Sequence, residues 1–134
     1  MRLRKTAEIV IGVLYAIGAV HQAFVVLPES GEFYLAMAEQ TWIRPAQVFV
    51  EEVLVPNSAA VTVLVALFEA ALAIAILSRG AAVRWALVAG GVFSIVGALT
   101  GSPAETIGYG LLAAVHFWLA RARRETSAPA EPDS

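Results

Sequence analysis

A small set of polar side chains interrupts the long apolar runs of this chain, and their types could do chemistry. Glu69 is the only acidic residue between Ala59 and Leu77. The other candidates are Tyr15, His21, Gln22, Tyr109 and His116. Carboxyl, imidazole and phenol groups give and take protons, and with an amide they can bind the polar group of a small ligand. These are therefore the candidate ligand-binding residues.

Glu69 is the strongest of these candidates. A charged side chain inside a bilayer costs ~2.5–3.5 kcal/mol on insertion scales, so it is kept away from lipid. Its helical face also carries Thr62, Ala66 and Ala73, which let a neighbouring helix come close. Glu69 should thus point into a helix bundle, neutral unless a cation lies near it. His21 is the nearest candidate partner in depth. The alternative roles are structural: a packing hydrogen bond for Glu69, and structural histidines at 21 and 116.

No metal site is predicted from these residues. His21 and His116 are offset by on the order of 10 Å along the membrane normal, at 1.5 Å per helical residue, so one ion cannot easily bind both. The chain has no cysteine, which excludes disulfides, thiolate metal sites and dithiol redox chemistry. A net charge of -2 without a basic, aromatic-rich stripe also argues against nucleic-acid binding.

The composition indicates that the candidate residues lie in a membrane. Of 134 residues, 59% are hydrophobic and 15% charged, whereas soluble domains are about half apolar and a quarter charged. A soluble domain this short has too little interior for so much apolar material. We therefore expect the excess to face lipid.

Four apolar runs approach the ~20 residues that a helix needs to cross the hydrocarbon core. We predict helices at about 8–27, 59–78, 83–100 and 104–121, in one transmembrane domain of residues 1–124. The first run exceeds the ~7–15 apolar residues of a signal peptide, which is the alternative. Ser102, Pro103 and Glu105 fit a helix start with a cap, a first-turn proline and a capping-box glutamate. The polar tail of residues 125–134 is predicted to be disordered.

Residues 31–55 connect the first two predicted spans and are not apolar enough to cross. Aromatic residues such as Tyr34 and Trp42 suit the membrane interface. The β-branched residues of 45–55 would fit a strand, but Phe49 and Val53 at a spacing of four favour a helix. We predict an interfacial amphipathic segment.

The basic residues predict the orientation. Of nine Lys and Arg residues, all but Arg44 fall on one side of the bilayer if the chain crosses four times, and three or five crossings would scatter them. The predicted fold class is therefore all-α: an integral membrane antiparallel four-helix bundle with an extra interfacial amphipathic segment between helices one and two. Both termini are expected in the cytoplasm.

The third predicted helix carries a face of small residues. Gly90, Ser94, Gly97 and Gly101 recur at spacings of three and four. Another helix backbone can come close to such a face, so these residues are predicted to serve helix packing.

With these features the sequence resembles the DoxX-like family of small bacterial membrane proteins. The resemblance rests on the stretch from Ile11 to His21 in helix one and on Phe68 to Ala73 in helix two. The family often has a glycine followed closely by a lysine near the outer end of helix one. Gly18 and His21 occupy those places here, so the cation has become titratable.

Helix two strengthens the resemblance. In the family a glutamate is often followed by small residues and by a glycine before a basic turn, and Glu69, Ala73 and Arg79-Gly80 look similar. The resemblance covers about residues 9–121. It implies a four-helix protein of the bacterial cytoplasmic (inner) membrane.

Some relatives look like subunits of quinone-linked sulfur oxidation, and others are implicated in redox or envelope-stress complexes. The resemblance therefore implies an accessory or ligand-binding subunit for a quinone-like or lipid-like molecule, with a partner membrane subunit or as a homo-oligomer. One alternative is a membrane oxidoreductase or isomerase that uses Glu69 and His21 for proton transfer. Another is a small proton-coupled transporter.

Overall fold

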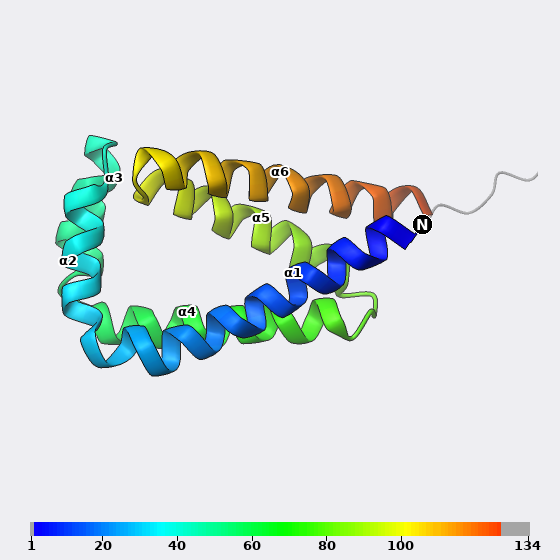
Figure 1. The fold of residues 1–134 in the computed structure, drawn as a ribbon, viewed down its shortest axis with the longest axis horizontal. Coiled ribbons are helices and arrows are strands. Elements are labelled where there is room, and N and C mark those ends of the chain that lie inside the picture. Colours follow the sequence, from blue (N-terminus) through cyan, green and yellow to red (C-terminus); the bar gives the residue numbers. More distant parts are fainter. Residues whose placement is uncertain (1, 127–134) are drawn as a thin grey trace, which may run out of the picture.

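The computed structural model describes residues 2–126, and in this range every regular element is a helix. The long helices are α1 (Arg2–His21), α4 (Ser58–Leu77), α5 (Val83–Thr100) and α6 (Pro103–Thr126). They run along the molecule in alternating directions, so that the start of α1 and the end of α6 lie together (Figure 1). The all-α prediction is confirmed for this part of the chain.

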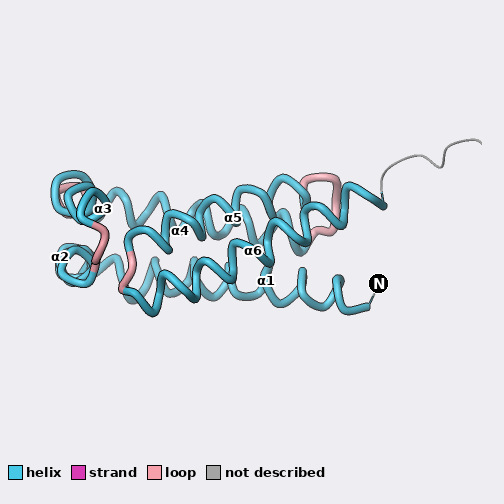
Figure 2. The backbone as a smooth tube through the Cα atoms, turned by 90° about the horizontal axis from the view of Figure 1, so that it is seen from above, coloured by secondary structure: helices cyan, strands magenta, loops and turns pink. Residues whose placement is uncertain are grey.

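The long helices are arranged as two pairs. α1 packs along α4 and α5 packs along α6, while α4 also contacts α5. The pairs lie close together at the end that holds the N-terminus and diverge toward the opposite end (Figure 1). Only short loops interrupt the helices, as Figure 2 shows.

Two shorter helices stand across the open end of the pairs (Figure 1). They are α2 (Ser30–Gln40) and α3 (Arg44–Phe49), and a π-helical turn, Val50–Leu54, follows them. We call residues 30–54 the crosspiece. The preference for a helix over a strand at 45–55 is confirmed.

Hydrogen bonds tie the crosspiece to both helix pairs. At α4, the Oγ atoms of Ser30 and Ser58 are 3.4 Å apart. At the α5–α6 turn, the Thr41 hydroxyl donates to the carbonyl oxygen of Thr100 over 2.6 Å. The neighbouring Trp42 indole N–H donates to the Thr106 hydroxyl over 3.0 Å. The crosspiece therefore bridges the gap between the pairs.

No loop separates the first predicted span from the segment that follows it. The chain continues from α1 through a π-helical turn, Gln22–Val26, and a 3₁₀ turn, Leu27–Glu29, directly into α2. In the π turn the Leu27 N–H donates to the Gln22 carbonyl, five residues back. Pro28 is tolerated because the first turn of a helix leaves its N–H groups unpaired.

α1 and α6 are longer than predicted because a remote ion pair extends them. α1 begins at Arg2 rather than near residue 8, and α6 ends at Thr126 rather than near residue 121. The Arg123 guanidinium donates two hydrogen bonds to the Glu8 carboxylate, over 2.9 and 2.7 Å, and this raises the pKa of Arg123. Glu8 is only 4% exposed. Of the predicted tail, 125 and 126 are helical, and 127–134 lie outside the described residues.

The predicted capping box at the start of α6 is confirmed. The Glu105 carboxylate accepts from the Ser102 N–H over 2.7 Å, and the Glu105 N–H donates to the Ser102 hydroxyl over 3.4 Å. At the start of α4, Asn57 occupies the cap position but makes no side-chain cap hydrogen bond. The Asn57 side chain instead donates back to the Val53 carbonyl over 2.8 Å.

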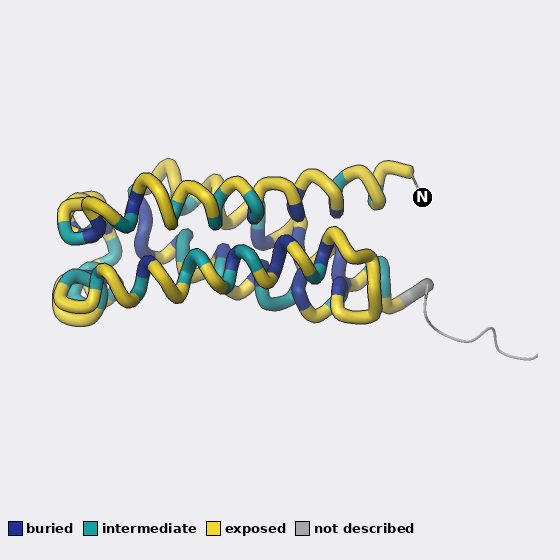
Figure 3. Tube along the Cα trace, turned by 90° about the horizontal axis from the view of Figure 1, so that it is seen from below, coloured by how far each residue is buried: buried dark blue, intermediate teal, exposed yellow. Residues whose placement is uncertain are grey.

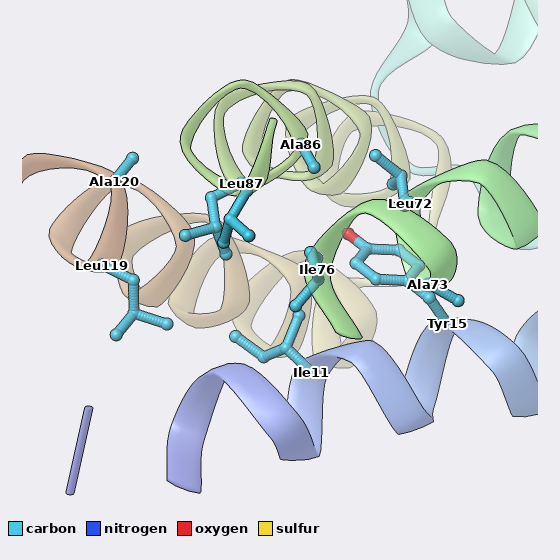
Figure 4. Close-up of a cluster of buried hydrophobic side chains, with 10 residues drawn as sticks. Ile11, Tyr15, Leu72, Ala73, Ile76, Ala86, Leu87, Leu119 and Ala120 are labelled. Atoms are coloured by element: carbon cyan, nitrogen blue, oxygen red, sulfur yellow. The ribbon is translucent and has the colours of Figure 1, made fainter. Parts of the chain in front are cut away.

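The hydrophobic core lies between the helix pairs toward the end where they converge. Figure 4 shows Ile11 of α1, Ile76 of α4, Leu87 of α5 and Leu119 of α6 pointing toward one another. The outward sides of the long helices are exposed along much of their length (Figure 3). Large apolar side chains such as Phe24 and Ile74 lie on those sides. Burial of apolar groups in the core thus leaves a second apolar surface outside.

Three helical stretches among the described residues are long and apolar enough to cross a membrane. They are the continuous run Arg2–Gln40, α4 and α5. α6 is not among them, although a crossing was predicted at 104–121. Its ionisable side chains include Glu105, which caps its start, the fully buried His116 and the basic residues at its end.

Candidate functional site

A cavity of about 160 Å³ lies between the two helix pairs, and we call it the polar chamber. Its polar lining consists of Tyr15, Gln22, Glu69, Ser94, Tyr109 and His116. Apolar residues complete it, namely Ile11, Leu14, Phe93 and Leu112. All four long helices contribute a wall, so the chamber exists only when the pairs are assembled.

Glu69 brings an unpartnered carboxyl group to the chamber. The residue is 9% exposed, and within the described part of the chain its Oε2 has no hydrogen-bond partner. A glycine makes room for it, because a Cβ at Gly18 would lie 2.8 Å from Glu69 Oε1. Gln22, one helical turn further on, has a buried Oε1 in the same unpartnered state. Buried polar atoms are nearly always paired with protein, water or ligand, so each of these two oxygens has room for one further hydrogen bond in the chamber.

Tyr15 and His116 form a second polar unit on the chamber wall. His116 is fully buried, and its Nδ1 is 2.7 Å from the Leu112 carbonyl oxygen. A carbonyl can only accept, so Nδ1 carries the proton and Nε2 is an acceptor. Tyr15 Oη lies 2.9 Å from that Nε2 and therefore donates to it. The Tyr15 oxygen keeps acceptor capacity toward the chamber.

The small face of α5 makes this arrangement sterically feasible. A Cβ at Gly90 would lie 2.5 Å from Tyr15 Oη and 2.8 Å from His116 Nε2. Further along the face, the Tyr109 ring lies against Gly97, where a Cβ would be 3.1 Å away. Ser94 is buried and donates to the Gly90 carbonyl over 2.9 Å. Gly101, the last member, lies against Glu105 at the α5–α6 turn.

A larger cavity of about 430 Å³ adjoins the chamber under the crosspiece, and we call it the outer cavity. Gln22, Phe93 and Tyr109 line both spaces. The outer cavity is otherwise mostly apolar, with Phe33, Met37, Phe49, Val61 and Val65 in its wall. A polar compartment thus opens beside an apolar one.

The structure brings together five of the candidate residues but leaves His21 apart from them. Tyr15, Gln22, Glu69, Tyr109 and His116 all line the chamber. His21 is exposed at the end of α1 and lines neither cavity. Residues 15, 18 and 22 share the inner face of the helix at spacings of three and four, and position 21 is about 100° around the helix from position 22. The expected approach of His21 to Glu69 is therefore not seen.

Sequence reasoning missed two lining residues of this site and one hydrogen bond. Ser94 was assigned to packing alone, and Phe93 was not singled out, yet both line the chamber. Their position beside Gly90 was the available signal. The partnership of Tyr15 with His116 spans 101 residues of sequence and left no local pattern.

Neither a metal site nor a similar known protein helps to assign a function to the chamber. Among the described residues no group of three His, Cys, Asp or Glu side chains could hold a metal ion. No family model, no curated protein and no solved structure matches the chain. The geometry of the chamber must therefore carry the functional argument.

Proposed function

We propose that this chain is an integral membrane protein with four crossings. Three stretches meet the length and apolarity that a crossing needs. α6 supports a fourth because its outward stripe is apolar: Ile107, Leu111 and Trp118 are all more than half exposed. In this helix His116 is fully buried and Glu105 caps the start. A helix whose lipid-facing side is apolar can cross even when its inward side is polar.

The orientation that we propose places both termini in the cytoplasm. Arg4, Lys5, Arg79 and Arg123 line one cavity, so the basic segments at the start of α1, after α4 and at the end of α6 meet at one end. The crosspiece, with its glutamates, lies at the other end. Positive loops remain on the cytoplasmic side. A bacterial inner membrane and membership of the DoxX-like family are parts of the same proposal.

Single cysteines test this topology cleanly because the chain has none of its own. In sealed inside-out vesicles, a membrane-impermeant thiol reagent should label Arg2→Cys and Arg124→Cys. It should not label Glu39→Cys in the crosspiece until detergent is added. Labelling of Arg2→Cys and Arg124→Cys on opposite sides would contradict four crossings.

We further propose that the chamber binds the polar head of a lipophilic small molecule, with a quinone-like head as the best fit. The carrying observation is the pair of buried, unpartnered oxygens of Glu69 and Gln22 beside an apolar cavity. A neutral Glu69 carboxyl group can donate to a ligand carbonyl, whereas Gln22 Oε1 can only accept and would pair with a ligand hydroxyl, such as that of the reduced quinol head. Phe93 and Tyr109 supply aromatic surface where the two cavities adjoin. An apolar tail would then lie in the outer cavity.

In this view the protein is an accessory or ligand-binding membrane subunit, as the resemblance implies. The wild-type protein should bind a short-chain quinone at one saturable site. Isothermal titration of protein in lipid nanodiscs measures this, with Phe24→Ala as a matched control because Phe24 lies on the outward surface. Equal heat from empty nanodiscs would show partitioning into lipid and contradict the site.

A proton-transfer enzyme is the second candidate, and the Tyr15–His116 hydrogen bond favours it. When a ligand hydroxyl donates to Tyr15 Oη, the phenol proton can pass to His116 Nε2, which is the free acceptor. The pair is thus arranged to take a proton from a bound hydroxyl. This is the proton-transfer role that the sequence predicts for His21. Tyr15→Phe would then abolish turnover while keeping ligand affinity, whereas a binding protein would show no turnover in either form.

A further inference from the structure

A third cavity, of about 270 Å³, lies at the end where the helix pairs converge, away from the polar chamber. We call it the basic cavity. α1, α6, the C-terminal end of α4 and the turn after it form its walls, with Arg4, Lys5, Glu8, Ile9, Ile76, Arg79 and Arg123. Four of these residues are basic and one is acidic, so the formal charge of the lining is four minus one, or +3. That sign suits an anion.

The one acidic residue of the basic cavity is already engaged. Glu8 accepts both hydrogen bonds from Arg123 and lies 3.8 Å from Arg4. Its negative charge is therefore balanced locally. Lys5 on α1 and Arg79 in the turn after α4, which are both exposed, add two further positive charges to the lining.

Arg79 occupies a backbone conformation that an L residue adopts at a cost. Its φ is 58°, and it is the only residue other than glycine with a positive φ in the described chain. Arg79 follows Ser78, the C-cap of α4, and a left-handed residue at that place is usually glycine, since a Cβ there costs roughly 1–2 kcal/mol. Gly80 is adjacent, yet the arginine stands at the strained position. Strain of this kind is characteristic of functional positions.

We infer that the basic cavity binds a phosphate group at the membrane surface. Guanidinium and ammonium groups from three elements can surround the oxygens of a phosphate with charge-assisted hydrogen bonds. Basic pockets between transmembrane helices are suited to anionic lipid headgroups. The same chemistry accepts free phosphate, so the test must separate the two sources.

The experiment compares two variants with equal loss of charge in the full-length protein. Lys5→Gln/Arg79→Gln removes two positive charges from the cavity lining. Arg2→Gln/Arg124→Gln removes two exposed charges from the same end but outside the lining. Native mass spectrometry from detergent measures retention of phosphatidylglycerol against phosphatidylcholine, and a parallel arm adds inorganic phosphate as competitor.

Wild type and the Arg2/Arg124 variant should retain phosphatidylglycerol. The affinity of the Lys5/Arg79 variant for this lipid should be lower by a factor of about ten or more. Competition by millimolar phosphate assigns the site to phosphate in general, and its absence assigns it to the lipid headgroup. Equal weakening in both variants, or no preference for the anionic lipid in wild type, overturns the inference.

Arg79→Gly guards against a folding artefact. Glycine relieves the positive-φ strain, so this variant should unfold at the same temperature as wild type or higher. It should still lose affinity for phosphatidylglycerol. Full retention of the lipid by a stable Arg79→Gly protein would show that the arginine does not contact the anion.

Discussion

Replacement of Glu69 by leucine should stabilise the protein and at the same time abolish ligand binding. The wild-type carboxyl group is buried with an unpartnered Oε2, and such a group costs about 1–3 kcal/mol. Leucine has a similar volume and no polar atom, so the free energy of unfolding should rise by an amount in this range. The same substitution removes the donor that we assign to the ligand carbonyl.

Two measurements check this prediction together. Chemical unfolding in detergent reports stability, and titration with a short-chain quinone reports affinity, which should fall at least tenfold. Glu69→Gln is the matched control because an amide keeps a donor in the same place, and it should retain part of the affinity. A purely structural Glu69 would give the opposite result, namely loss of stability in Glu69→Leu.

The second large effect is expected at Gly90. An added Cβ would lie 2.5 Å from Tyr15 Oη and 2.8 Å from His116. Because both side chains are buried and hydrogen-bonded, they cannot move aside easily. Gly90→Ala should therefore lower the free energy of unfolding by ~1–3 kcal/mol, as overpacking does. It should also break the Tyr15–His116 hydrogen bond, which the ¹⁵N shifts of the His116 ring report.

Gly108→Ala provides the control for this prediction. Gly108 is also within a helix, and nothing lies within 4 Å of a Cβ placed there. Alanine at an open helical position stabilises by roughly 0.5–1 kcal/mol relative to glycine. The two alanine variants should therefore differ in sign. Equal effects would show that the contacts at Gly90 are looser than the distances indicate.

The sequence predicted the two central helices well because local signals define them. Helices expected at 59–78 and 83–100 are found at Ser58–Leu77 and Val83–Thr100. Two long, mostly apolar runs and the intervening Ser-Arg-Gly turn mark these boundaries. The ends of α1 and α6 were misplaced because Glu8 and Arg123 stabilise each other across 115 residues of sequence. No local pattern reveals a contact of that kind.

The candidate site could be predicted only in part for the same reason. Small residues on the face of Glu69 predicted that it turns inward, and Glu69 is indeed buried in the structure. Which histidine lines the chamber depends on the rotation of α1 about its axis and on how α6 packs against α5. His21 and His116 are equivalent in type, but only His116 meets Tyr15. Helix rotation and pairing are tertiary properties.

The most direct test of the chamber is photoaffinity labelling of the wild-type protein with an azido-quinone, followed by mapping of the labelled peptides by mass spectrometry. The account predicts labels at chamber and outer-cavity residues such as Tyr15, Phe93 and Tyr109, and their loss when excess unlabelled quinone is present. Labels confined to outward residues such as Phe24 and Trp118, unaffected by competitor, would contradict it.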